Sequence, residues 1–328
     1  MLKKIIGDNQ CAIYNIEDGK ETRVQRCVIS TPETRAICND PLVMGVNYTR
    51  KLQNACSKVI AGLQQSNNIQ LEEKETIVFN ILRGGLNFGL REAIADAFDW
   101  NQIGSSFISA QRARVSKDSE DWHIIESAYK KVYMPDVAQI VIGDVVATGT
   151  SLKHGLKALI EQAEINQTHL RSILFFTVGG PITEEILEEV DAMCRKRFPE
   201  YEKTTLCYIE GRFEVPSPDT NLNIKITGTD LIRLNALMAP EFVESQYEKP
   251  TYPIERCTIY DAGSRAFWLP EYIDDVKHYW EENLKLAENG MTYEELLNER
   301  FPLIDASKFA EKDLIQMCEQ MVEALNSL

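Results

Sequence analysis

The feature that most constrains the fold is the segment 139–152, which reads QIVIGDVVATGTSL. It begins with β-branched aliphatic residues, passes through Gly143 and Asp144 into a turn of small residues, and is followed by apolar residues at helical spacing. That order predicts a buried strand, a tight turn and the start of a helix. Such a succession is typical of an α/β protein built on a parallel sheet.

The turn itself, residues 147–151, has the composition of an anion-binding site. Backbone N–H groups at a helix start lack partners and carry partial positive charge, which attracts a phosphate. Gly149 lets the backbone approach an anion closely, and hydroxyl donors are added by Thr148, Thr150 and Ser151. No lysine follows the glycine, so this is not the lysine-bearing phosphate loop of ATPases and GTPases. An ordinary strand-to-helix connection is the alternative interpretation.

A second corner of the same kind lies upstream, in the segment 76–90, TIVFNILRGGLNFGL. Its first seven residues form an apolar run broken only by an asparagine, which predicts a buried parallel strand. Arg83, Gly84 and Gly85 then turn into an expected helix. The planar fork of Arg83 could bind two phosphate oxygens. Alternatively, Arg83 neutralises a nearby carboxylate and the glycines only permit a tight turn.

Together the two corners resemble the type I phosphoribosyltransferases, over roughly residues 70–210. The TGTS wording resembles the loop that holds the 5′-phosphate of phosphoribosyl pyrophosphate (PRPP), and LRGGL resembles the pyrophosphate loop of uracil phosphoribosyltransferases. The resemblance implies that Asp144 binds the ribose hydroxyls. It implies a 5′-phosphate site made by Ala147, Thr148, Gly149, Thr150 and Ser151, and a pyrophosphate site made by Arg83, Gly84 and Gly85.

The chain departs from the family at one position. The family usually carries two adjacent acidic residues ahead of the turn, whereas here the first is Gly143 and only Asp144 remains. This departure leaves the phosphate site intact but fits reduced catalysis.

The polar segment 111–123, QRARVSKDSEDWH, follows an expected strand over Ile103–Ala110. In the family, a mobile loop at this position closes over PRPP and excludes water. We therefore expect a mobile loop from which Arg112 or Arg114 contacts the pyrophosphate during catalysis. A solvated surface loop with ordinary charges is the alternative.

The implied reaction is displacement of pyrophosphate from C1 of PRPP by a nitrogen acceptor, most simply a nucleobase. The implied cofactor is Mg²⁺ bound mainly through pyrophosphate, and a homodimer is expected by analogy. Phe176, Tyr208 and Phe213 could offer stacking faces to the acceptor, although packing explains them equally well. Two alternatives stay open: a regulatory protein of the same fold that binds PRPP or a nucleotide, and a different α/β phosphate-ester enzyme.

Composition excludes several classes of partner. The net charge of −15 argues against a nucleic-acid surface, which needs clustered cations. No apolar run is long enough to span a bilayer, and the first residues lack the apolar core of a signal peptide. The eight cysteines form no C-x-x-C pair and the four histidines show no metal-ligand spacing. We expect a cytoplasmic protein with reduced thiols.

The expected organisation is an α/β core over 1–215, with a parallel sheet and helices on both faces, followed by an irregular and then helical region over 216–328. Within the core, Ser30 and Glu33 suggest a capping box for a short helix. In the C-terminal region, helices are expected over about 270–287, from Thr292 with Glu295 as a capping box, and from about Ser307.

Overall fold

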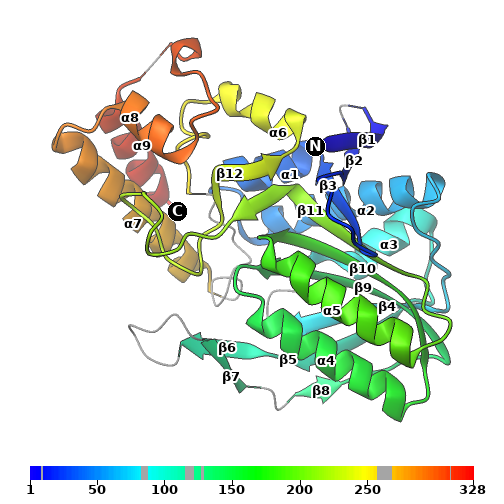
Figure 1. Cartoon of the computed structure of the whole chain (residues 1–328). Helices are drawn as coiled ribbons and strands as arrows, with labels where there is room; N and C mark the ends of the chain where they lie inside the picture. Colours follow the sequence, from blue (N-terminus) through cyan, green and yellow to red (C-terminus); the bar gives the residue numbers. More distant parts are fainter. Residues whose placement is uncertain (9, 83–87, 115–121, 127–128, 257–267, 311) are drawn as a thin grey trace.

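The centre of the fold is a mixed sheet, with ten strands in the part of the chain that the structure describes (Figure 1). The computed structural model describes residues 1–8, 10–82, 88–114, 122–126, 129–256, 268–310 and 312–328, with the backbone alone for 111–114, 122–123 and 125–126. The strand order is β1-β2-β3-β11-β10-β9-β4-β5-β8, and β12 pairs with β11. The strands are β1 (Leu2–Gly7), β2 (Ala12–Ile16), β3 (Gln25–Ser30), β4 (Thr76–Leu82), β5 (Gly104–Ser109), β8 (Lys130–Lys131), β9 (Val137–Val146), β10 (His169–Gly179), β11 (Lys203–Glu214) and β12 (Ile232–Met238).

The six strands from β3 to β5 in this order are all parallel. The predicted apolar strand Thr76–Leu82 is β4, and all of its residues except the last are buried. Such a run belongs in a parallel strand because helices cover both of its faces. Antiparallel pairing is found where β1 and β2 extend the sheet, where β8 joins β5 and where β12 joins β11. The carboxyl ends of the six parallel strands therefore meet at one edge.

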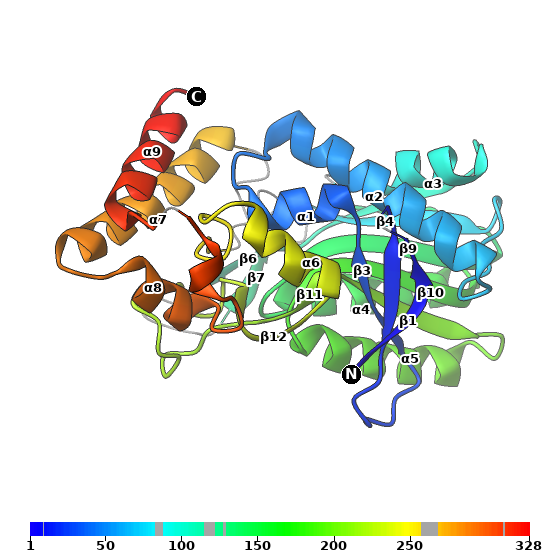
Figure 2. The ribbon, with the colours of Figure 1, turned by 90° about the horizontal axis from the view of Figure 1, so that it is seen from above.

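Helices cover both faces of the sheet, as the sequence predicted (Figure 2). One face carries α1 (Pro32–Asn39), α2 (Gly45–Gln65) and α3 (Leu90–Phe98), and the other carries α4 (Thr150–Ile165) and α5 (Ile182–Arg197). Close approach of α4 depends on Gly155, where a β-carbon would lie 2.7 Å from Cδ1 of Ile81 in β4. The predicted α/β class with a helix-flanked sheet is confirmed.

The C-terminal region is mainly helical and gathers at one end of the molecule (Figure 1). Its helices are α6 (Pro240–Ser245), α7 (Leu269–Glu288), α8 (Tyr293–Arg300) and α9 (Leu314–Asn326). Buried polar contacts hold α7 in place. Arg256 pairs with Asp275 of α7 and lies 3.5 Å from Asp230, and Trp280 donates to Glu255 at 3.0 Å. These groups tie α7 to the segment that follows β12.

Strands in two regions of the chain were missed in the sequence. The hairpin of β1 and β2 forms where only short apolar segments were recognised, and β12 forms inside the stretch expected to be irregular. Both pair antiparallel with a neighbouring strand, so partners elsewhere in the sheet supply the hydrogen bonds. Short strands of this kind owe more to tertiary pairing than to their own pattern.

Helix starts were predicted with mixed success. The Thr292–Glu295 capping box is confirmed. The first helix is instead capped by Thr31, which forms its box with Thr34, while Glu33 pairs with Lys58 at 2.7 Å.

The last helix was placed too early in the sequence. Residues 306–308 form a single 3₁₀ turn, and α9 begins at Leu314. The reason is Asp313, whose carboxylate accepts a hydrogen bond from the backbone N–H of Gln316 at 3.0 Å and so caps the helix.

Candidate functional site

The topology of the sheet points to the carboxyl ends of β4 and β9 as the best-placed ligand site. These strands are parallel neighbours, with Ile77 opposite Ile140. The helix after β4 lies on one face of the sheet and the helix after β9 lies on the other (Figure 2). Open α/β sheets bind ligands at such a reversal of connection, outside the carboxyl ends of the strands. Both glycine corners singled out in the sequence directly follow these two strands.

The turn between β9 and α4 has the geometry expected of an anion site. Gly149 adopts a left-handed conformation, with φ of +74°, and is the N-cap residue of α4. Because glycine has no side chain, no side-chain oxygen of the N-cap residue accepts a hydrogen bond from the first N–H groups of this 16-residue helix. A β-carbon here would also overlap Ile186 of α5. The left-handed backbone therefore favours glycine at this position, and a larger residue would also have to displace the end of the Ile186 side chain.

The hydroxyl groups of the turn already have protein contacts. The hydroxyl oxygens of Thr148 and Thr150 lie 3.3 Å apart at the N-terminus of α4. Ser151 donates to the backbone carbonyl of Ala110 at 2.9 Å, which ties the start of α4 to the end of β5. The structure thus gathers the predicted phosphate-binding residues 147–151 at one point, and Ser151 also has a structural role.

Asp144 lies near the carboxyl end of β9, half-buried, opposite Thr177 of β10. One of its oxygens, Oδ1, accepts a hydrogen bond from the backbone N–H of Val145 at 2.9 Å. This contact fixes the carboxylate beside the turn.

The missing acid at position 143 has a steric explanation. A β-carbon at Gly143 would overlap the ring of Phe88, which is fully buried. The space that a second carboxylate would need is occupied by a phenyl ring from the segment after β4. The site therefore has a single acid at this point of β9.

The remaining predicted contact residues belong to the segments 83–85 and 111–114 of the sequence. Arg83, Gly84 and Gly85 lie outside the described residues. The segment of Arg112 and Arg114 is a strand, although no strand was predicted there. It forms β6 (Gln111–Arg114), which pairs antiparallel with β7 (Trp122–Glu126). Both strands contact α4, so the hairpin starts beside the phosphate-type turn. The side chains of both arginines are outside the described part.

The suggested acceptor-stacking residues are wrong. Phe176, Tyr208 and Phe213 are all fully buried and belong to the core. Tyr208 donates to the carbonyl of Gly180 at 3.3 Å, and Phe213 packs edge-on against Phe242 with ring centroids 6.1 Å apart. Strand-end aromatics on a sheet covered on both faces pack under helices, which is why they cannot reach a ligand here.

One unusual residue at the same edge was missed in the sequence. Glu210 of β11 is fully buried and has a left-handed backbone, with φ of +61°. Its carboxyl group accepts a hydrogen bond from Thr34 of α1, and burial raises its pKa to about 8. Ser30 and Arg35 moderate that rise. A glutamate followed by Gly211 inside an apolar strand was the only sequence signal, and its full burial assigns it to the scaffold.

Metal and membrane features were also searched among the described residues. No group of three or more histidine, cysteine or acidic side chains is placed to hold a metal ion there. Within the same part of the chain, no helix is both long and apolar enough to cross a membrane.

Comparison with known proteins gives weak likenesses only. The chain matches no protein-family model and no curated protein. Similar solved structures include a hypoxanthine phosphoribosyltransferase from Staphylococcus aureus, with 18% identity, a TM-score of 0.29, and coverage of 49% of this chain and 75% of that one. Another is the adenine phosphoribosyltransferase from Trypanosoma brucei, with 12% identity, a TM-score of 0.33, and coverage of 56% and 83% respectively. Similarity at this level does not identify a reaction.

Proposed function

We propose that the chain binds PRPP at the carboxyl ends of β4 and β9 and transfers its phosphoribosyl group to a nitrogen acceptor, most simply a nucleobase. The observation that carries the proposal is the position of the 147–151 turn. The N-terminus of α4 has no side-chain cap and begins with a left-handed glycine. It follows β9, next to β4, where the connecting helices change from one face of the sheet to the other. A sugar phosphate is the ligand that fits such a turn beside a carboxylate.

The reaction breaks the bond between C1 of the ribose and the pyrophosphate oxygen, and forms a bond from C1 to the acceptor nitrogen. Positive charge develops on the ribose ring as pyrophosphate leaves with the bonding electrons. In our proposal the backbone of 147–151 holds the 5′-phosphate and Asp144 orients the ribose hydroxyls. Fixed positions for these groups would provide catalysis through orientation and electrostatics. The arginines at 83, 112 and 114 would bind the pyrophosphate.

Magnesium fits this site as part of the substrate complex. The described residues form no protein cage for a metal, and Asp144 is the acid beside the turn. Mg²⁺ commonly binds through substrate phosphates with few protein ligands. In our proposal it arrives as the magnesium complex of PRPP and neutralises charge on the pyrophosphate.

A second function is favoured by one specific contact. Because the Phe88 ring fills the space beside Gly143, the site has one acid where the resembled family usually has two. A protein of this fold that binds PRPP or a nucleotide without turnover, as a regulator, would need no second acid. The two functions share the phosphate site and differ only in pyrophosphate release.

The test combines calorimetric binding of magnesium–PRPP with pyrophosphate release across a panel of purine and pyrimidine bases. Binding with release supports the transferase, and binding without release under any base supports the regulator. Asp144→Asn should weaken binding or turnover about tenfold or more, since it removes a charged hydrogen-bond acceptor. The matched control is Asp136→Asn, which makes the same change at an exposed residue just before the other end of β9. Equal behaviour of the two folded variants would contradict the ribose contact.

A further inference from the structure

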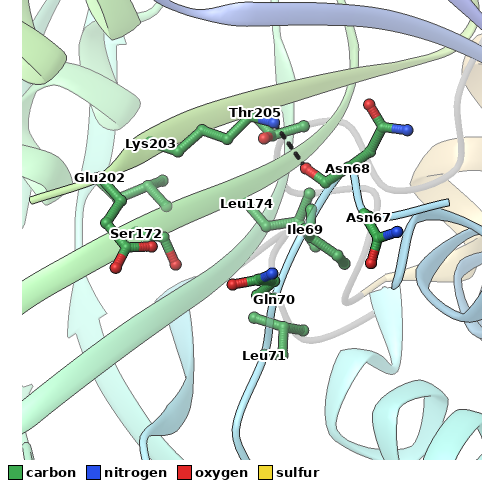
Figure 3. Close-up of a pocket in the computed structure, with 11 residues that line it drawn as sticks. Asn67, Asn68, Ile69, Gln70, Leu71, Ser172, Leu174, Glu202, Lys203 and Thr205 are labelled. Atoms are coloured by element: carbon green, nitrogen blue, oxygen red, sulfur yellow. Dashed lines mark hydrogen bonds between the residues drawn. The ribbon is translucent and has the colours of Figure 1, made fainter. Parts of the chain in front are cut away.

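A cavity of about 210 Å³ opens at the edge of the sheet opposite the phosphate-type turn (Figure 3). It lies between the first residues of β10 and β11 and the segment that follows α2. The residues that shape it include Asn68, Ile69, Leu71, Leu174, Lys203 and Thr205. Because Lys203 is the first residue of β11, this is the amino end of the parallel strands. The cavity is therefore separate from the site proposed above.

Lys203 is the basic residue of the cavity, and it is half-buried. Its ammonium group donates to the carbonyl of Asn68 at 2.8 Å, as the dashed line in Figure 3 marks. Across the described part of the chain, no carboxylate oxygen comes within 4.0 Å of this ammonium. The neighbouring Glu202 is exposed, and its carboxylate lies 3.5 Å from Nε of Arg171 instead. Burial lowers the pKa of Lys203. In a chain of net charge −15, a half-buried cation without an acidic partner is a place for an external anion.

Part of the cavity lining is apolar. Ile69, Leu71 and Leu174 are all buried, and Ile69 and Leu174 lie next to each other below Lys203 and Thr205 in Figure 3, with Leu71 further down beyond Gln70. A ligand that contacts both the Lys203 ammonium and the aliphatic side chains must carry a negative charge at one end and hydrocarbon at the other. A cavity of this volume has room for a small organic molecule.

The charges of the cavity residues indicate which anion it would bind, a phosphate or a carboxylate. A phosphate dianion carries two negative charges, whereas the cavity offers one cation, Lys203, with the carboxylate of Glu202 at the rim. A carboxylate carries a single negative charge and leaves the rest of the molecule free to pack against aliphatic side chains. A monocarboxylate therefore matches the cavity better than a phosphate.

We propose that this cavity is a second binding site, for a small organic monocarboxylate whose carboxylate pairs with Lys203 and whose hydrocarbon part packs against Ile69, Leu71 and Leu174. The site does not depend on the proposed transferase function, because it lies at the opposite edge of the sheet.

The test uses titration calorimetry and ligand-observed NMR with butyrate, hexanoate and benzoate, and with the amide of each acid. Each carboxylate should bind at least tenfold more tightly than its amide, because the amide lacks the charge that pairs with Lys203. Lys203→Met keeps the length of the side chain but removes its charge, and it should weaken carboxylate binding about tenfold or more. The matched control is Lys74→Met, which removes the same charge from an exposed lysine outside the cavity and should leave binding unchanged.

A second variant keeps the proposal testable if Lys203→Met does not fold. Ser172→Leu enlarges a half-buried side chain that lines the cavity, so it should abolish binding while Lys203 stays in place. Thermal unfolding of each variant shows whether it is folded. The proposal would be overturned if acids and amides bound with equal affinity, or if inorganic phosphate bound more tightly than the carboxylates. It would also be overturned if no carboxylate bound at millimolar concentration, or if either folded variant bound them as well as the natural protein does.

Discussion

At the scale of single residues, two glycines define the candidate site in opposite ways. Gly149 permits the turn into α4, because its backbone is left-handed and a β-carbon there would overlap Ile186. Position 143 has no room for a second acidic side chain, because the Phe88 ring fills the space next to Gly143. The first could be foreseen from the small residues around it. The second could not, because it depends on a contact between positions 55 residues apart in the sequence.

Gly149→Ala should destabilise the protein for two reasons, a left-handed backbone and overlap with Ile186. The matched control is Gly19→Ala, where φ is +78° but a β-carbon would meet nothing within 4 Å. The control should lose about 1–2 kcal/mol from backbone strain alone. Gly149→Ala should lose at least about 1 kcal/mol more because of the clash. Urea unfolding measures both, and equal losses would show that Ile186 yields without cost.

At the scale of elements, Glu210 joins β11 to the start of α1 and makes that contact sensitive to pH. Its pKa is raised from the usual 4.5 to about 8 by burial. Between these values the folded protein keeps a proton that the unfolded chain has released. The contribution of Glu210 to stability is therefore complete below about pH 4.5 and is lost as pH rises toward 8.

Glu210→Gln removes this titration while it keeps a group of similar shape. Measured by urea unfolding from pH 5 to pH 9, the stability of the variant relative to the natural protein should rise by a few kcal/mol, on the order expected for a shift of several pKa units. A difference that stays constant across this range would contradict a buried, protonated glutamate at neutral pH.

The core strands and long helices could be predicted from sequence because their own residues dictate them. The apolar run 76–82 became β4, and the helix expected over about 270–287 became α7, Leu269–Glu288. Elements set by distant partners could not be predicted. The polar segment that starts at Gln111 pairs into a hairpin with β7, and β12 depends on the far end of β11. Composition gives no sign of such pairing.

The same division holds for the candidate site. The turn 147–151 was recognisable because its chemistry is local. Burial of the aromatic side chains at 176, 208 and 213 was not, since it depends on helices packing over both faces of the sheet. The cavity around Lys203 was missed for a similar reason, because its walls come from three separate segments.

At the scale of the whole molecule, the C-terminal helices are bound to the core through buried charge. Arg256, almost fully buried, pairs with Asp230 and with Asp275 of α7, while Arg233 donates to the carbonyl of Cys38 at 2.7 Å. In both views these helices lie beyond the same edge of the sheet as β6 and β7 (Figures 1 and 2). The region is thus placed beside the proposed site.

Arg256→Met should destabilise the whole chain by about 3–5 kcal/mol, because it leaves buried carboxylates without their partner. The matched control is Arg197→Met, which breaks an exposed pair with Glu164 at 2.7 Å and should cost no more than about 1 kcal/mol. Thermal unfolding of both variants tests this. Equal effects would mean that the buried cluster is relaxed by water or by protonation of Asp230.

The central claim is that the 147–151 turn holds a sugar phosphate, and amide NMR of the labelled protein titrated with ribose 5-phosphate tests it most directly. The largest saturable shifts should fall on the backbone N–H groups of residues 148–151, and they should vanish in a folded Gly149→Ala variant. Saturable shifts confined to other parts of the chain, with these amides unmoved, would contradict the account.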